Sequence, residues 1–345
     1  MNRERLVAIS YEADDELRKA NLDVLDAQAR VVFLAGLHPA ERAPALRQAE
    51  VLIGWMLKRE LRPGELDAAR QLRFIQLLSA GADNVDFTAI PQGIVLAGNV
   101  GAYAKPIAEH VMAMALSMAK RIPQRHAALA RGRFDQQIPS LTLDGAVCGI
   151  LGFGGIGQAA ARLMRAFGAS IYSVNTSGRT GEPVEFAGTL ADLPLVAAAA
   201  DVLVIALPLT NGTRGIIGRR ELAMMKPTAI LVNVARADIV DERALYEHLS
   251  ANPDFSAGID TWWQEPWGGG TFRTAYPFLE LPNVIGSPHN SGVVAGIEAF
   301  AARRAAENVG RYLRGDSLTG VVRPEDYTPG TKPLQARAFR SSEPP

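Results

Sequence analysis

Three residues of different chemical type lie in three segments that each follow an apolar, strand-like run. Arg236 lies in residues 233–242 and supplies a planar cation that could hold a carboxylate and polarise a neighbouring oxo group. His289 lies in residues 287–292 and could give or take a proton near neutral pH. Glu265 lies in residues 257–266 and could orient that imidazole and favour its charged form. The three types together predict proton-coupled reduction or oxidation at C2 of a 2-oxo or 2-hydroxy acid.

Each residue also has an ordinary structural interpretation. His289 could only cap a loop, and Glu265 could be a solvated loop charge. Arg236 could form an ion pair with Asp241 or Glu242. Because all three follow successive strands, whose carboxyl ends are where ligands bind in open α/β sheets, we favour the catalytic interpretation.

A glycine-rich turn lies between an apolar run at 147–151 and a helix-like stretch at 158–167 that Gly168 ends. Its pattern is G-x-G-x-x-G. The first glycine permits a tight turn, the second lets the backbone approach a pyrophosphate, and the third allows close packing of helix and strand. Free N–H groups at the helix start would bind the phosphates. The turn predicts an NAD(P) site with contacts from Gly152, Gly154, Gly155, Ile156 and Gly157, and a glycine loop without a ligand is the alternative.

The residues after the next strand bear on the choice of cofactor. An acidic residue at this place accepts hydrogen bonds from the ribose of NAD, whereas here the turn contains Asn175, Thr176, Ser177 and Arg179. These side chains could donate to a 2′-phosphate, and the arginine could neutralise it. We therefore favour NADP over NAD, with an ordinary polar turn that accepts NAD as the alternative.

The elements that must position these residues follow a β-α-β rhythm, which is typical of parallel sheets covered on both faces. The length of 345 residues suggests two domains. Two series of apolar runs are predicted as strands, five in the first and six in the second. They lie at 6–10, 31–34, 51–55, 74–78 and 94–97, and at 147–151, 171–174, 202–207, 229–234, 256–259 and 284–286. Helices are predicted at 106–116 and 296–313, and residues 315–345 are expected to wrap the surface or be disordered.

Composition excludes several classes of protein. Lys plus Arg and Asp plus Glu number 36 each, so nothing favours a nucleic-acid partner. Without a signal peptide or an apolar stretch long enough to span a membrane, a cytoplasmic protein is expected. Cys148 is the only cysteine and is expected to be a small buried residue. Because no His/Cys cluster has metal-ligand spacing, no catalytic metal is expected.

The other histidines have less specific surroundings. His110 lies on the helix predicted between the two series of strands, where a packing role is expected more than catalysis. His38, His126 and His248 lie in polar stretches and are expected at the surface.

In order and spacing these motifs resemble the D-isomer-specific 2-hydroxyacid dehydrogenase family, which includes phosphoglycerate, glyoxylate/hydroxypyruvate and D-lactate dehydrogenases. The resemblance covers roughly residues 51–322 and rests on segments 78–86, 152–157 and 207–210 and on those around Arg236, Glu265 and His289. It implies an α/β protein with two doubly wound parallel-sheet domains, in which a Rossmann cofactor domain is inserted into a flavodoxin-like substrate domain. The implied limits are 1–104 plus 291–330 for the substrate domain, 105–290 for the cofactor domain and 331–345 for a tail. Dimers that form through the cofactor domain are also implied.

The resemblance further implies roles for particular residues. Those implied to bind substrate are Ser79, Ala80, Gly81, Arg236 and His289. The resemblance also implies further cofactor contacts, with Asp260 near the nicotinamide carboxamide. These contacts are Leu207, Pro208, Thr213, Val234, Ala235, Arg236, Asp260 and His289.

Some positions depart from the family pattern and leave the substrate open. Ala237 replaces a usual glycine, Trp262 and Trp263 replace a smaller pair, and Asn290 follows the histidine. Formate dehydrogenases of this superfamily pair the histidine with Gln, which Glu265 does not match. A dehydrogenase of an inorganic oxyanion such as phosphite and an NAD(P)-sensing corepressor-type binding protein remain as alternative functions.

Overall fold

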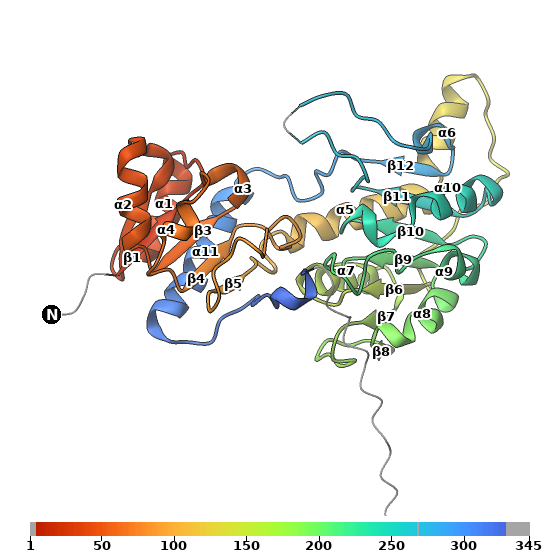
Figure 1. The fold of residues 1–345 in the computed structure, drawn as a ribbon. Coiled ribbons are helices and arrows are strands. Elements are labelled where there is room, and N and C mark those ends of the chain that lie inside the picture. Colours follow the sequence, from red (N-terminus) through yellow and green to blue (C-terminus); the bar gives the residue numbers. More distant parts are fainter. Residues whose placement is uncertain (1–4, 268, 329–345) are drawn as a thin grey trace, which may run out of the picture. The chain divides into compact units, whose positions relative to one another are not determined.

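The computed structural model describes residues 5–267 and 269–328 and separates them into two compact units. Residues 5–109, 154–159 and 290–327 form the first unit, and the other described residues form the second. Both units consist of a parallel sheet with helices on its faces (Figure 1). The domain limits that the sequence predicts stay a prediction, and the predicted tail at 331–345 lies outside the described residues.

The first unit contains a five-stranded sheet in the order β2-β1-β3-β4-β5, with every pair parallel. Its strands are β1 (Leu6–Ile9), β2 (Arg30–Phe33), β3 (Val51–Gly54), β4 (Phe74–Leu77) and β5 (Val95–Ala97). This is the flavodoxin-like order, as expected. Each strand lies within one residue of its predicted limits, because strands covered on both faces are short uninterrupted apolar runs.

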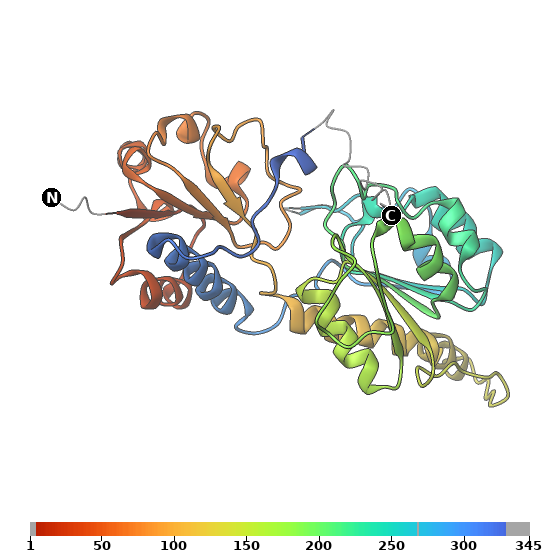
Figure 2. The ribbon, with the colours of Figure 1, turned by 90° about the horizontal axis from the view of Figure 1, so that it is seen from below.

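Helices cover both faces of this sheet. On one face α1 (Asp15–Leu25) packs beside α11 (Ile297–Arg314), which returns from the far end of the chain (Figure 2). The small buried residues of α11 allow a close approach to the sheet: Ala301, Ala302, Ala305 and Ala306. The other face is covered by α2 (Pro39–Gln48), α3 (Leu57–Glu60) and α4 (Glu65–Ala68). Two 3₁₀ turns, η1 (Leu34–Gly36) and η5 (Pro324–Asp326), complete the unit.

The segment after α11 does not leave the first unit at once. Gly315, at a φ of +78°, ends the helix in the left-handed conformation that favours glycine. The chain then forms an antiparallel bridge from Val321 to Ala97, and Val322 N–H donates to the carbonyl of Leu96 at 2.8 Å. The described part of this segment, up to residue 328, therefore covers the edge strand β5, which is one of the two outcomes expected.

The second unit contains a seven-stranded parallel sheet in the order β12-β11-β10-β9-β6-β7-β8. Its strands are β6 (Val147–Leu151), β7 (Ser170–Val174), β8 (Phe186–Gly188), β9 (Val202–Ile205), β10 (Ile230–Asn233), β11 (Ser256–Ile259) and β12 (Val284–Gly286). The doubly wound order is that of a Rossmann sheet. The predicted number of six strands was wrong, because β8 (Phe-Ala-Gly) contains a single large apolar side chain and no β-branched residue, so it forms no apolar run.

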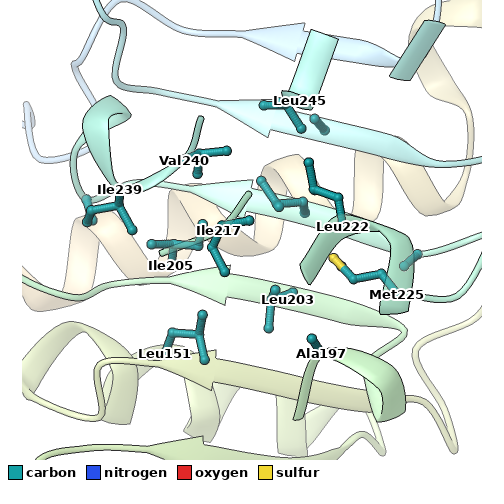
Figure 3. Close-up of a cluster of buried hydrophobic side chains, with 14 of the residues drawn as sticks. Leu151, Ala197, Leu203, Ile205, Ile217, Leu222, Met225, Ile239, Val240 and Leu245 are labelled. Atoms are coloured by element: carbon teal, nitrogen blue, oxygen red, sulfur yellow. The ribbon is translucent and has the colours of Figure 1, made fainter. Parts of the chain in front are cut away.

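Helices on one face of the second sheet enclose its main core. They are α8 (Leu193–Ala199), α9 (Arg219–Met224) and α10 (Glu242–Ala251), and between them and the strands lie Leu203, Ile205, Leu222 and Leu245 (Figure 3). On the other face Met114 of α5 (Ala104–Ala119) approaches β11 so closely that a Cβ on Gly258 would lie 2.9 Å from its sulfur.

The remaining elements are α6 (Ile122–Ala130), α7 (Gly155–Ala166), η2 (Leu190–Asp192), η3 (Ala237–Ile239) and η4 (Phe278–Glu280). His248 on α10 is half-buried, its ring centroid lies 4.6 Å from that of Phe255 in an edge-on arrangement, and burial lowers its pKa. The expectation that His248 lies at the surface was therefore wrong. No helix among the described residues is long and apolar enough to span a bilayer.

Candidate active site

The predicted catalytic residues follow three adjacent strands. The strands β10, β11 and β12 are neighbours and run parallel, so their carboxyl ends lie at one edge of the sheet. Arg236 follows β10, Asp260 comes directly after β11 with Glu265 in the same loop, and His289 follows β12. This edge is where open α/β sheets bind ligands.

Glu265 and His289 are in direct contact. Both carboxylate oxygens lie 2.9 Å from the imidazole Nδ1, and 25% of the His289 side chain and 16% of the Glu265 side chain are exposed. The carboxylate also accepts a hydrogen bond from the backbone N–H of Trp262 at 2.9 Å, which fixes it in its loop. Because an ionised carboxylate only accepts, Nδ1 bears a proton in this pair. Nε2 is then the ring nitrogen that can exchange a proton with a bound molecule.

The backbone of His289 has an unusual conformation. Its φ is +51°, in the left-handed region that non-glycine residues seldom adopt. The N–H of His289 donates to the carbonyl of Asp260 at 2.8 Å, which holds this conformation. Backbone strain of this kind concentrates at functional sites, because the surrounding structure must maintain it.

Arg236 is positioned by the end of its own strand. The buried side chain of Asn233 accepts from the N–H of Ala235 and donates to the carbonyl of Arg236, both at 3.0 Å. The guanidinium Nη1 donates to the carbonyl of Ala235 at 2.7 Å. Asp241, one of the partners considered for Arg236, accepts a hydrogen bond from the N–H of Ala244 as the N-cap of α10.

The two tryptophans stabilise the loops that bear the candidate residues. Trp262 is buried, and its indole N–H donates to the carbonyl of Ser287 at 2.8 Å, two residues before His289. Trp263 donates to the carbonyl of Val240 at 3.0 Å and stacks on Phe278. A third tryptophan, Trp267, is 54% exposed and contacts the His289 ring edge-on at 5.2 Å between centroids.

The glycine turn has the geometry of a dinucleotide site. Gly152 has a φ of +94°, and a Cβ there would lie 2.4 Å from the carbonyl oxygen of Ala206, so only glycine fits. A Cβ on Gly154 would meet no atom within 4 Å, which leaves the backbone open to a ligand. Gly155 begins the 12-residue helix α7, whose free N–H groups suit a pyrophosphate. The residues of this turn therefore fit a dinucleotide.

The turn after β7 is organised by Asn175. Its side-chain oxygen accepts from the N–H groups of Ser177 and Gly178 and from the Ser177 hydroxyl, and its amide donates to the carbonyl of Arg179. The side chain of Asn175 and the hydroxyl of Ser177, both predicted to donate to a phosphate, are thus hydrogen-bonded within the turn. Thr176, Ser177 and Arg179 are exposed at its surface.

The other expected cofactor contacts lie at strand ends of the same sheet. Leu207 and Pro208 follow β9, and Val234 and Ala235 follow β10. The hydroxyl of buried Thr213 donates to the carbonyl of Pro208 at 2.7 Å and closes that turn.

The expected carboxylate-binding loop lies in the first unit, after β4. The Ser79 hydroxyl donates to the carbonyl of Gly81 at 2.8 Å, and the carbonyl of Ser79 accepts from the N–H of Asn99. A Cβ on Gly98 would lie 2.4 Å from the carbonyl oxygen of Ala80, so the loop packs tightly on this segment.

Sequence reasoning missed two residues that position the site, Asn233 and Ser287. Asn233 is a polar residue at the end of an apolar strand, a signal that could have been followed. Ser287 lies next to Pro288 and His289, but its contacts come from elements distant in the sequence, so no local pattern predicts them. Among the described residues no group of three or more His, Cys, Asp or Glu could hold a metal ion.

Comparison with known proteins identifies the family. The model of the D-isomer specific 2-hydroxyacid dehydrogenase, NAD binding domain, matches residues 112–291. A D-3-phosphoglycerate dehydrogenase from Methanocaldococcus jannaschii is 31% identical over 318 residues, which are 89% of this chain and 58% of that relative. A glyoxylate/hydroxypyruvate reductase B from Yersinia enterocolitica is 34% identical over 292 residues, 83% of this chain and 87% of the relative. A solved structure from Pyrobaculum aerophilum, provisionally named a formate dehydrogenase, covers 93% of this chain and 99% of its own with a TM-score of 0.77 and 25% identity.

The fold and the matched domain define the class as nicotinamide-dependent oxidoreductases. The chain belongs to the D-isomer-specific 2-hydroxyacid dehydrogenase family.

Proposed function

We propose that this protein transfers a hydride between NAD(P)H and C2 of a small 2-oxo or 2-hydroxy acid. The observation that supports this most directly is the pairing of both Glu265 oxygens with Nδ1 of His289 at 2.9 Å. It leaves the other ring nitrogen available to the reacting oxygen.

The chain's own groups then have separate tasks. His289 holds at Nε2 the proton that the C2 oxygen receives on reduction, and accepts it on oxidation. Glu265 keeps the imidazole in one orientation and stabilises its charged form. Arg236 binds the substrate carboxylate and polarises the oxo group, and backbone N–H groups near Ala80 and Gly81 assist. A bound nicotinamide supplies or receives the hydride.

We infer NADP as the preferred cofactor, with NAD as the alternative. The support is the turn after β7, which contains no acidic residue among 175–179 and presents Arg179 at its surface. A carboxylate at this turn would repel a 2′-phosphate, whereas a guanidinium attracts it.

The relatives suggest the size of the substrate. They are named for glyoxylate, hydroxypyruvate and phosphoglycerate, all small 2-oxo or 2-hydroxy acids. We assign cofactor binding to residues 105–290 and substrate binding to residues 1–104 and 291–330, with Arg236 and His289 as the substrate contacts that the cofactor domain contributes.

We also propose a homodimer. The helix α6 and the loop after it expose several large apolar side chains to water, which is unfavourable and typical of a surface that binds another protein. These side chains are Ile122, Leu129, Phe134, Ile138 and Leu141. This segment projects from the second unit (Figure 1), and a second copy of the chain would cover it.

The test is oxidation of NADH and NADPH, followed by absorbance, with glyoxylate, hydroxypyruvate, pyruvate and phenylpyruvate. We expect turnover with at least one acid. We expect His289→Ala to lose about 10²–10⁴-fold in kcat while cofactor still binds, because a general acid contributes about that much. His38→Ala, at an exposed histidine that precedes α2, is the matched control and should keep wild-type kcat.

Near wild-type turnover in His289→Ala would remove His289 from the role of acid and base. Consumption of neither cofactor with any acid would favour a binding protein on the same scaffold.

A further inference from the structure

Trp267 differs in its surroundings from the other two tryptophans in the loop between β11 and β12. Trp262 is buried and Trp263 is partly buried, and the indole N–H of each donates to a backbone carbonyl. Trp267 is 54% exposed, and its ring centroid lies 5.2 Å from that of His289 at an interplanar angle of 67°. Solvent and ligands can therefore reach a large apolar ring that touches the proposed acid and base.

The turn that bears Glu265 also positions this indole. Trp267 comes two residues after Glu265, and its N–H donates to the carbonyl of Glu265 at 2.8 Å. The N–H of Gly269 donates to the carbonyl of Pro266 at 3.1 Å. Gly269 and Gly270 have φ values of +108° and +123°, which side chains rarely permit, so the chain can turn sharply after the indole. The indole therefore belongs to the same tight turn as the carboxylate that holds His289.

The contacts of the imidazole limit which part of a substrate can meet this indole. Both oxygens of Glu265 lie against Nδ1 of His289, so the C2 oxygen of a substrate would lie about 2.9 Å from Nε2. C2 bears two other groups, the carboxylate, which we assign to Arg236, and the side chain. The side chain is therefore the group that is left to contact the indole of Trp267.

We propose that Trp267 is the surface on which the side chain of the substrate packs, and that the preferred substrates are 2-oxo acids with an aromatic side chain. This rests on the proposed function and narrows its substrate. An aromatic side chain would remove apolar area of the indole from water and add a favourable ring contact. Residues 266–272 contain no charged side chain, so a phosphorylated substrate would meet no cation there. The competing explanation is that Trp267 only packs on His289 and restricts the motion of its ring.

The test compares two acids that differ by one phenyl ring. Phenylpyruvate bears this ring on the methyl carbon of pyruvate, so the ratio of their kcat/KM values reports on the contacts of the ring. A change in the motion of His289 affects both acids alike and cancels in the ratio. We expect the wild-type protein to favour phenylpyruvate by about 10-fold or more, with cofactor at saturation.

We expect Trp267→Ala and Trp267→Gln to bring this ratio close to one, because both remove the aromatic ring. Trp267→Phe should keep most of the preference, because it retains an aromatic face. Phe167→Ala, at an aromatic side chain of the same unit that is 49% exposed, is the matched control and should leave the ratio unchanged. Two different disruptive variants keep the test decisive if one of them does not fold.

A kcat/KM that falls by the same factor for both acids in the disruptive variants would overturn the contact with the substrate, because Trp267 would then act through His289 alone. A wild-type protein that prefers pyruvate would overturn the aromatic substrate class. A wild-type protein that reduces neither of these acids, nor glyoxylate or hydroxypyruvate, would instead contradict the proposed function itself.

Discussion

The imidazole of His289 is held at two levels, through its side chain by Glu265 and through its backbone by the carbonyl of Asp260. The left-handed backbone directs the side chain in a way that an extended loop would not. The proton-transfer geometry at the site therefore depends on a few local bonds, and each can be changed separately.

We expect Glu265→Gln to lower kcat on the order of 10²-fold or more while the KM of the cofactor changes little. An amide can accept from Nδ1 but does not stabilise an imidazolium as a carboxylate does. Steady-state kinetics with each substrate varied in turn measure this split. A kcat within a few-fold of wild type would indicate that Glu265 is an ordinary loop charge.

At this scale the sequence was informative where chemistry is local. The glycine turn could be predicted because its backbone torsions require glycine at fixed spacing. The three strand ends could be predicted because buried strands are uninterrupted apolar runs. The sequence identified the position of Asn175 but not the direction of its side chain. An amide has both donor and acceptor groups, and here both form hydrogen bonds within the turn. The contact of His110 with Ser287 joins residues 177 positions apart, which only the packed sheet brings together.

The turn between β7 and β8 is the element that should decide between the two cofactors. We expect Arg179→Ala to weaken NADPH binding by about 10-fold, because a charged hydrogen bond to the 2′-phosphate is lost, and to leave NADH binding nearly unchanged. Direct binding titrations with both cofactors measure this. An equal effect on the two cofactors would mean that Arg179 does not contact a 2′-phosphate.

In the first unit a buried ion pair joins α2 to α4. Arg42 donates from Nε and Nη2 to the two oxygens of Glu65, each at 2.8 Å, and only 7% and 8% of these side chains are exposed. The guanidinium also donates to the carbonyls of Leu34 and Glu60, so its donors are well satisfied. Removing one partner should cost roughly 3–5 kcal/mol of stability, because a buried charge would remain unpaired.

This pair makes stability depend on pH. The hydrogen bond from Arg42 holds the pKa of Glu65 below its ordinary value of 4.5. A lowered folded-state pKa contributes stability that is present above the unfolded value and is lost as pH falls through the folded one. We expect the melting temperature of the wild type to fall more steeply below pH 4.5 than that of Glu65→Gln. Parallel slopes would show that the pair does not contribute in this range.

For the molecule as a whole, the exposed apolar side chains of α6 and the loop after it should determine the oligomeric state. We expect Phe134→Asp, at a side chain that is 77% exposed, to convert a dimer into monomers, because a charge would be buried at the contact. Light scattering coupled to size exclusion measures the mass. Thr176→Asp, at an exposed residue of the same unit, is the control. A wild-type protein with the mass of a monomer would contradict the proposed homodimer.

The architecture of the whole could be predicted because alternating strands and helices admit few parallel arrangements. The predicted domain limits themselves stay a prediction. Residues 154–159 belong to the first unit although they lie between strands and helices of the second, and Gly155, where a Cβ would lie 2.8 Å from Cα of Gly101, accounts for this.

The helix α11 has a consequence for how the chain is made. It covers an apolar face of the first sheet that includes Val7, Ile9, Val51 and Phe74. That sheet is complete at Ala97, but the helix begins only at Ile297, 200 positions later. At about 5–20 residues per second a ribosome needs roughly 10–40 s for this distance. Throughout that interval only α1 covers this face, and the part that α11 will cover stays exposed, so a polypeptide released before Ile297 should aggregate or remain bound to a chaperone.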